Sequence, residues 1–280
     1  MTHGTARAWR FGCQARPWIQ TLGMPTFREA LPTVMRHIDG IGFTGFETAL
    51  PALPLDAPST FMAWRASAND IALAAAHTGG TWWEPDVAAT VPSIVERASR
   101  LPELGCDRLL VSIGAGVTHL DGKGLAQVCR TLRTLGEGCS QHGVTICIHN
   151  HAHELQDDAR VLRAILEYTD PEQVSLGADI GWVVNGGWDV VDFLATFGDR
   201  IGYLHVRDVI ATVDPPGFIE VGHGTMDWSA VTARVRDLGF DGWLTAESEY
   251  SELWHGREDA IETATAQYEG MTRVFGTHPG

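Results

Sequence analysis

The chain has 280 residues, of which 44% are hydrophobic and 20% charged, a composition typical of a folded globular protein with a sizeable core. Its formal net charge of -15 argues against a nucleic-acid partner, because binding to a phosphate backbone draws its affinity from clustered Lys and Arg. The five cysteines include no CxxC pair, so neither a disulfide framework nor a thiolate zinc site is indicated. No segment approaches the roughly 18 apolar residues of a membrane span, and the first residues lack a signal-peptide stretch. We therefore expect a cytoplasmic protein that binds no membrane.

Short apolar or β-branched runs alternate with longer amphipathic runs from one end of the chain to the other. This alternation is the pattern of βα units around a parallel sheet. The predicted strands are residues 9–14, 45–48, 71–77, 108–113, 144–149, 174–180, 201–206 and 242–246. The predicted helices are residues 27–38, 60–69, 87–104, 125–142, 160–168, 190–197, 228–238 and 257–274.

Three glycines mark the ends of predicted helices, namely Gly105, Gly143 and Gly239, and each leads directly into the next strand. A glycine in this position predicts a helix that ends in the left-handed conformation. No low-complexity segment or linker divides the chain. We predict one α/β domain over residues 1–280, a single (βα)8 TIM barrel, with a doubly wound open sheet as the alternative.

The stretch VTICIHNHAHE, residues 144–154, carries the strongest chemical signal. A buried fifth strand ends there in His149, His151 and His153 at alternate positions, followed by Glu154. A solvated histidine-rich loop is the alternative reading. In a barrel, side chains at the carboxyl ends of the strands share one mouth, where the active site lies.

The next three strands also end in potential metal ligands, which are Asp179, His205 and Glu247. Taken singly, each has a plainer reading: a helix cap for the aspartate, a core histidine, and a solvated surface glutamate. Their joint occurrence on neighbouring strand ends favours one divalent metal ion. Carboxylate and imidazole ligands without sulfur suit Mn²⁺ first, with Co²⁺, Mg²⁺ or Zn²⁺ as alternatives.

Several of these runs resemble one family. The runs are ICIHNHAHEL, LGADIGWVVNGGWDVVDFL, RIGYLHVRD, VGHGTMDWSAV and GFDGWLTAESE. They are similar to the second half of the xylose-isomerase-like TIM-barrel superfamily of sugar phosphate isomerases and epimerases, in the branch that includes inosose dehydratases. GFTGFETAL and ALAAAHTGG in the first half are compatible with that resemblance, so it covers most of the chain.

The resemblance implies one ion held by a residue from each of strands 5 to 8. Asp179, His205 and Glu247 match three of those positions. For strand 5 we expect Glu154 to be the ligand, with His149 as the alternative and His151 free for proton transfer. Where the family has a lysine two residues after the strand-7 histidine, this chain has Arg207, which keeps the charge and changes its geometry.

Other polar and aromatic residues of the mouth are candidates for substrate binding, and the plainer reading of each is a structural or packing role. The predicted substrate-binding residues are Glu47, His77, His149, Trp182 and Arg207. Glu47 and His77 could instead support the metal ligands from behind. Trp82, Trp83 and Trp188 could form a stacking wall for a sugar ring or simply pack within loops.

The function that follows is a metal-dependent isomerase or epimerase of a keto-sugar or cyclic polyol ketone, acting through an enediolate. Glu154 and Glu247 are the expected metal-bound carboxylates that shuttle protons, and His151 is the expected general acid or base. A dehydratase or lyase acting on an inosose or a 3-keto-glycoside is the alternative. An apurinic-site endonuclease shares the barrel but would need a basic DNA-facing surface. The expected partner is a small sugar or cyclitol, and the apolar, Ala-rich helices are compatible with a homo-oligomer.

Overall fold

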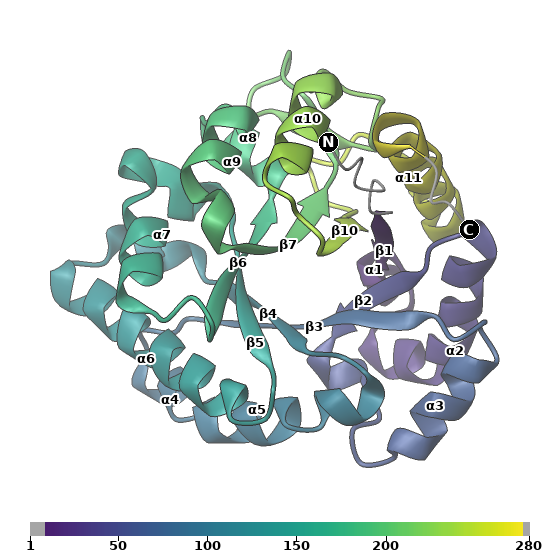
Figure 1. Ribbon diagram of the computed structural model, residues 1–280, viewed down its shortest axis with the longest axis horizontal. Coiled ribbons are helices and arrows are strands. Elements are labelled where there is room, and N and C mark those ends of the chain that lie inside the picture. Colours follow the sequence, from purple (N-terminus) through teal and green to yellow (C-terminus); the bar gives the residue numbers. More distant parts are fainter. Residues whose placement is uncertain (1–8, 277–280) are drawn as a thin grey trace, which may run out of the picture.

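The computed structural model describes residues 9–276, and within them eight parallel strands close into a barrel (Figure 1). Around the ring the strand order is β1-β10-β7-β6-β5-β4-β3-β2. The barrel strands are β1 (Arg10–Gln14), β2 (Gly45–Ala49), β3 (Ala72–Gly80), β4 (Arg108–Ile113), β5 (Thr145–His149), β6 (Val174–Asp179), β7 (Ile201–Val206) and β10 (Trp243–Ala246). The predicted TIM barrel is confirmed, and the open-sheet alternative is wrong.

Helices form a ring outside the strands (Figure 1). They are α1 (Arg16–Leu22), α2 (Met24–Ile41), α3 (Pro58–Ala66), α4 (Pro85–Ala88), α5 (Val91–Ala98), α6 (Gly122–Ser140), α7 (Gln156–Tyr168), α8 (Ile180–Asn185), α9 (Val190–Phe197), α10 (Trp228–Asp237) and α11 (Ala260–Phe275). Short 3-10 helices cover Leu50–Ala52, Leu101–Leu104, Ala115–His119, Ala152–Leu155 and Gly198–Arg200. None of the described helices has the length and apolar character that a bilayer crossing needs.

The structure differs from the predicted elements in a few places. The predicted helix 87–104 is divided into α4, α5 and a 3-10 helix that begins at Leu101. Pro102 lies in the first turn of that last segment, where its missing N–H removes no intrahelical hydrogen bond. The sequence analysis also missed α1, α8 and a hairpin formed by β8 (Asp208–Ile210) and β9 (Gly217–Ile219). Elements of three to seven residues are too short to display a periodicity.

The three predicted glycine stops are confirmed. Gly105, Gly143 and Gly239 have φ of 78°, 75° and 64°, in the left-handed region where a side chain is disfavoured. At each of these glycines the chain turns from the helical layer towards the start of the next barrel strand.

The barrel interior is filled from the base towards the mouth. A small cluster inside the ring comprises Ala74, Ala75, Leu110, Cys147 and Tyr203, with Trp243 packed against it. A much larger apolar cluster lies between the strands and the helices. Tyr203 is fully buried, and its hydroxyl lies 3.1 Å from Glu47 Oε2. It therefore connects the apolar interior of the barrel with the polar side chains at the mouth.

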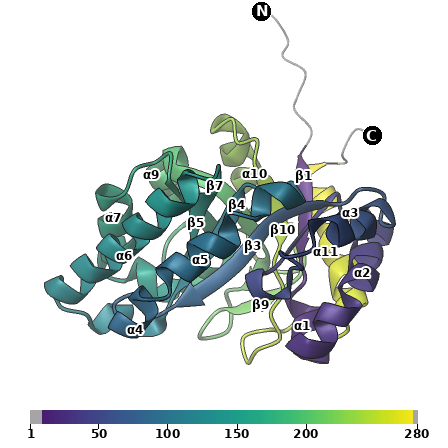
Figure 2. The ribbon, with the colours of Figure 1, turned by 90° about the horizontal axis from the view of Figure 1, so that it is seen from below.

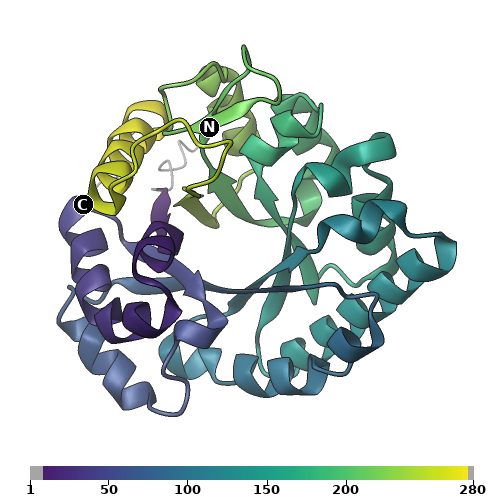
Figure 3. The ribbon, with the colours of Figure 1, turned by 180° about the vertical axis from the view of Figure 1, so that it is seen from behind.

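The mouth of the barrel is bordered by α1 and by the β8–β9 hairpin. Figure 2 shows α1 and β9 at the lower edge, on the end of the barrel to which the parallel strands run. From that end, Figure 3 shows α1 in dark purple beside β1 and the green hairpin segment at another part of the rim. These segments supply several of the side chains that surround the polar residues at the mouth.

Candidate metal centre

Four side chains from neighbouring strands converge at the mouth. His149 ends β5, Asp179 ends β6, His205 lies in β7, and Glu247 directly follows β10. Asp179 and His205 are register partners, and the Glu247 amide donates to the Val206 carbonyl. Each residue offers one ligand atom, and these four atoms lie within 4.8 Å of one another. All four residues are buried, with at most 3% of the surface exposed.

This donor set fits a divalent cation. Two imidazoles and two carboxylates provide the nitrogen and oxygen ligands that Mn²⁺, Co²⁺ or Zn²⁺ accept. Two carboxylates buried this closely repel each other and need positive charge between them. The group could therefore bind a divalent metal ion.

His205 occupies the middle of the group and is held from both sides. Its Nε2 lies 2.5 Å from Glu47 Oε2, and its Nδ1 lies 2.9 Å from Glu247 Oε2 and 2.9 Å from His149 Nδ1. Because a carboxylate only accepts, the contact with Glu47 requires a proton on Nε2, and the contact with Glu247 requires one on Nδ1. A bound cation would replace the proton on Nδ1, the nitrogen that faces the group. Burial lowers the pKa of His205, but Glu47 and Glu247 outweigh it and raise that pKa well above its ordinary value.

Glu47 is the centre of a buried hydrogen-bond network behind His205. Its carboxylate accepts from the Tyr203 hydroxyl at 3.1 Å and from Gln14 Nε2 at 3.2 Å, and Thr245 Oγ1 donates to the Tyr203 hydroxyl at 2.6 Å. Glu47 is only 1% exposed. Glu47 therefore lies behind His205, and Gln14 is a member of this network that the sequence analysis missed.

Asp179 is tied to both the backbone and a cation. Its Oδ1 accepts from the amides of Gly181 and Trp182 at 2.8 and 3.1 Å, so it caps α8 as well as facing the group. Its Oδ2 accepts from Arg207 Nη2 at 2.5 Å. A metal ion at this site would either bind Asp179 together with Arg207 or displace the Arg207 guanidinium from the Asp179 carboxylate.

Arg207 is fully buried beside the group. Its guanidinium carbon lies 3.6 Å from the centre of the Phe218 ring and 5.2 Å from that of Trp182, and Nη2 is 3.8 Å from Glu247 Oε1. Burial would raise the pKa of Glu247, but Arg207, His205 and His149 together hold it well below its usual range. Glu247 is therefore ionised at neutral pH. Phe218 was missed because it belongs to the short β8–β9 hairpin.

Glu154 does not join the four residues; it lies in a second group with His151 and His153. Its Oε2 accepts from the His151 amide at 2.7 Å, and its Oε1 lies 3.0 Å from His153 Nε2. His153 Nε2 also donates to the Ile113 carbonyl at 3.0 Å. The structure thus places His149, the alternative, where the sequence analysis expected Glu154, and it gives Glu154 the position of a side chain that orders the turn after β5.

His151 belongs to the second group and also packs against His149 of the first. Its ring centre is 4.8 Å from that of His149 and 5.3 Å from that of Trp182, and within residues 9–276 its Nδ1 has no hydrogen-bond partner. Burial, assisted by His153, lowers the pKa of His151 to about 3. The ring is therefore neutral at neutral pH, and burial disfavours its protonated form.

The remaining predicted residues lie nearby with different partners. His77 Nε2 lies 2.8 Å from Ser112 Oγ, and its ring centre is 6.0 Å from that of His149. Trp82 donates to the Ser112 carbonyl, and Trp188 donates to the Leu155 carbonyl, as expected of loop packing. Asn150, which the sequence analysis missed, is hydrogen-bonded to both backbone groups of Asp179 and sets its position.

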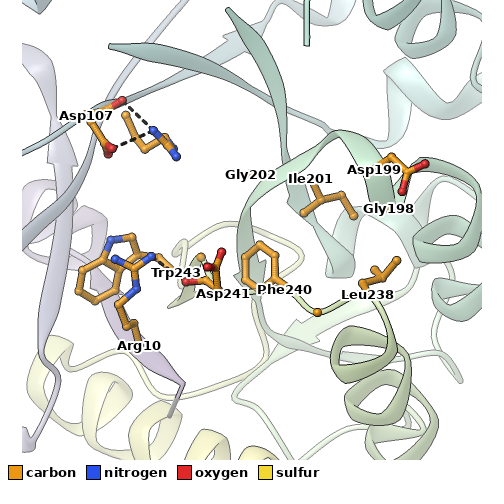
Figure 4. A pocket seen from close by; sticks show the side chains of 13 residues that line it. Arg10, Asp107, Gly198, Asp199, Ile201, Gly202, Leu238, Phe240, Asp241 and Trp243 are labelled. Atoms are coloured by element: carbon orange, nitrogen blue, oxygen red, sulfur yellow. Dashed lines mark hydrogen bonds and ion pairs between the residues drawn. The ribbon is translucent and has the colours of Figure 1, made fainter. Parts of the chain in front are cut away.

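A separate hollow of about 320 Å³ lies at the opposite, amino-terminal end of the barrel (Figure 4). Three of its charged side chains have partners: Arg10 donates to the Asp241 carbonyl and stacks on Trp243, and Arg108 pairs with Asp107. In TIM barrels this face contributes to stability rather than to chemistry. The chemistry-bearing residues therefore lie at the other end.

The sequence model of the family described as xylose isomerase-like TIM barrel matches residues 36–269. An inosose dehydratase of Geobacillus kaustophilus is 26% identical over 182 residues, which cover 54% of this chain and 59% of the relative. Another, from Mesomycoplasma hyopneumoniae, is 34% identical over 92 residues, or 33% of this chain and 30% of the relative. The match therefore spans less than two thirds of either relative.

Solved structures extend the likeness over nearly the whole chain at the level of the fold. A D-allulose 3-epimerase from Methylomonas sp. superposes with a TM-score of 0.72 at 16% identity, over 96% of this chain and 98% of that one. A 3-keto-D-glucoside 4-epimerase from E. coli has a TM-score of 0.68 at 18% identity, over 95% and 98%.

Proposed function

Since the chain belongs to the xylose isomerase-like TIM-barrel family, we propose that it is a divalent-metal-dependent isomerase or epimerase of a keto-sugar or cyclic polyol ketone. The observation that carries this proposal is the buried group of two imidazoles and two carboxylates at the barrel mouth. A site of this composition suits removal of a proton from a carbon next to a carbonyl.

The proposed ligands are His149, Asp179, His205 and Glu247, and Mn²⁺ is the proposed ion. His149 replaces Glu154 in this set because its ring contacts His205, whereas the Glu154 carboxylate is engaged by the His151 amide and by His153. Glu154 then serves as a positioning residue for the turn that carries His151. Carboxylate ligands favour Mn²⁺ over softer ions, with Co²⁺, Mg²⁺ and Zn²⁺ as alternatives.

A bound divalent ion would polarise the substrate carbonyl and an adjacent hydroxyl. Glu247 is ionised and takes the proton from the neighbouring carbon, whose C–H electron pair forms the new C=C bond as the carbonyl π pair moves onto oxygen. Glu247 then holds the proton, and His151 is the proposed group through which the proton is relayed. Return of the proton to the other carbon of the enediolate gives isomerisation, and its return from the opposite face gives epimerisation.

Arg207 contributes a permanent positive charge beside this chemistry. Its guanidinium is fixed by Asp179 and by the Phe218 ring, so it is positioned to stabilise negative charge that develops on a substrate oxygen. Trp182 and His77 complete the proposed substrate-facing surface.

The second candidate is a dehydratase or lyase acting on an inosose or a 3-keto-glycoside. Two curated relatives with detectable sequence similarity, both inosose dehydratases, favour it. The same proton removal applies, but the enediolate then expels a β-hydroxyl or an alkoxide instead of being reprotonated. An apurinic-site endonuclease is disfavoured by the net charge of -15.

The test is incubation of the Mn²⁺-loaded protein in D₂O with inososes, ketohexoses and 3-keto-glycosides, followed by NMR and mass spectrometry. We expect deuterium at a carbon next to the carbonyl, and the product mass separates isomerase from dehydratase. Absence of exchange with every ketone, despite bound Mn²⁺, would overturn the proposal.

A further inference from the structure

A hollow of about 270 Å³ lies beside the candidate centre, at the ends of β1 to β3. Glu47 and His77 line it, and Glu47 also contacts His205 at 2.5 Å, so a single side chain separates the hollow from a proposed ligand. The four proposed ligands are almost fully buried. A ligand that occupies this hollow would therefore approach the centre from the side of β1 and α1.

Three polar side chains that line the hollow carry atoms with no hydrogen-bond partner within residues 9–276. These atoms are Gln14 Oε1, Thr48 Oγ1 and Arg16 Nε. Gln14 and Thr48 are only 7% and 2% exposed. A buried polar atom without a partner costs about 1–3 kcal/mol, so a ligand that reaches these atoms would be stabilised by the hydrogen bonds that they lack.

The orientation of the Gln14 amide is fixed. Its Nε2 lies 3.2 Å from Glu47 Oε1, and only the amide nitrogen can donate to a carboxylate. The opposite atom, Oε1, must then be an acceptor without a donor. Thr48 offers a hydroxyl, which both donates and accepts, and Arg16 Nε offers a donor. This combination is complementary to the hydroxyl groups of a polyol.

Apolar side chains also line the hollow. Ile19 of α1 and Met24 of α2 line it, and both are half-buried and packed against the main apolar cluster. A lining that combines polar and apolar side chains suits a sugar or cyclitol ring, which presents hydroxyls at its rim and C–H bonds on its faces. The volume is close to the lower limit of roughly 300 Å³ for ligand pockets, which suits one ring.

The charges around the hollow favour a neutral ligand. Arg16 is the only Lys or Arg among its described lining residues, and its Nη2 lies 2.5 Å from Glu249 Oε1. Glu47, the one acidic lining residue, adds negative charge on the inner side. A phosphate placed here would meet a cation that is already paired and a carboxylate that repels it.

We propose that this hollow is the subsite for the part of the substrate remote from the reacting carbonyl, and that it binds an unphosphorylated polyhydroxylated ring through Gln14 Oε1 and Thr48 Oγ1. This inference rests on the proposed function and specifies its substrate class. Gln14 also links the subsite to the centre, because it and His205 contact opposite oxygens of the Glu47 carboxylate.

The test is Thr48→Val, which replaces the unpartnered hydroxyl by a methyl of similar size. In the deuterium-exchange assay we expect KM to rise about 2- to 10-fold, the value of one hydrogen bond to a neutral group, with kcat within twofold of wild type. Thr48→Ser should restore KM. The melting temperature of Thr48→Val should not fall, because the hydroxyl has no partner to lose.

Thr44→Val is the matched control. Thr44 precedes β2 at the opposite end of the barrel, where its hydroxyl donates to the Phe11 carbonyl, so KM should not change. If the wild-type protein exchanges deuterium and Thr48→Val has an unchanged KM, the subsite is refuted while the proposed function stands.

If the wild-type protein shows no exchange, the subsite is tested by binding alone, without turnover. Saturation-transfer NMR measures the binding of myo-inositol and of myo-inositol 1-phosphate to the Mn²⁺-loaded protein. We expect transfer to the neutral cyclitol that weakens in Thr48→Val, and weaker transfer to the monophosphate. No transfer to myo-inositol, equal transfer in both proteins, or stronger binding of the monophosphate would contradict the inference.

Discussion

Replacing Glu47 by Gln tests how the protein orients His205. Glu47 Oε2 lies 2.5 Å from His205 Nε2, and the pair is buried from solvent. The isosteric amide keeps the shape, but it removes the charge and, in one of its two orientations, presents a donor to Nε2. Hydrogen bonds to charged groups contribute about 1.5–3 kcal/mol, and about 1.4 kcal/mol corresponds to a tenfold change in an equilibrium constant. We expect the Kd for Mn²⁺ to rise about 10- to 100-fold, the range known for outer partners of metal-bound histidines.

Isothermal titration calorimetry with Mn²⁺, combined with thermal unfolding, measures this effect and separates it from misfolding. Tyr203→Phe is one control, because it removes a neutral donor to Glu47 and leaves the carboxylate in place. Glu220→Gln is a second, since Glu220 is a buried carboxylate whose described partner is Arg257. Both controls should retain Mn²⁺ affinity within about threefold, less than the tenfold loss expected of an outer partner. A folded Glu47→Gln protein with wild-type affinity would refute the reasoning.

Three further predictions concern the structure around the centre. Asp208→Ala should lower the free energy of unfolding by at least about 3 kcal/mol in urea titrations, because its buried carboxylate accepts four hydrogen bonds; a loss under about 1 kcal/mol would contradict this. Gly181→Ala should weaken Mn²⁺ binding, since a Cβ there would lie 2.8 Å from Arg207 Cγ, whereas Gly122→Ala meets nothing within 4 Å and should leave binding unchanged. All five cysteines are buried, so a thiol reagent such as Ellman's should react only after unfolding, and rapid labelling of the native protein would argue against the packing.

The cysteine prediction has an electrostatic basis as well as a steric one. Burial raises the pKa of the Cys106 and Cys139 thiols to about 12 and of Cys147 to about 11. The thiolate is the reactive form, so at neutral pH almost none is present in the folded protein.

The barrel could be predicted from the sequence because its strands are apolar runs that end abruptly in polar residues. That rule located Asp179, His205 and Glu247, which the structure brings together. It also applies to Gln14, which ends β1 in the same way, but one polar residue after a short run was not enough to single it out.

The strand-5 ligand could not be chosen from the sequence because the choice depends on the path of the chain after β5. His149 and Glu154 are five residues apart, and the turn between them folds into a 3-10 helix that directs Glu154 back to the His151 amide. Contacts such as Glu47 with His205 join residues 158 positions apart and depend on barrel closure. The β8–β9 hairpin, which supplies Phe218, has three-residue strands that show no readable alternation.

The central claim is that His149, Asp179, His205 and Glu247 hold one divalent ion. Electron spin echo envelope modulation of the Mn²⁺-loaded wild-type protein tests it directly, because it counts the imidazole nitrogens bound to the ion without altering any residue. The account predicts two coordinated nitrogens, from His149 and His205. A single coordinated nitrogen would show that one of the two histidines is not a ligand and would contradict the four-residue set, and none would contradict the site altogether.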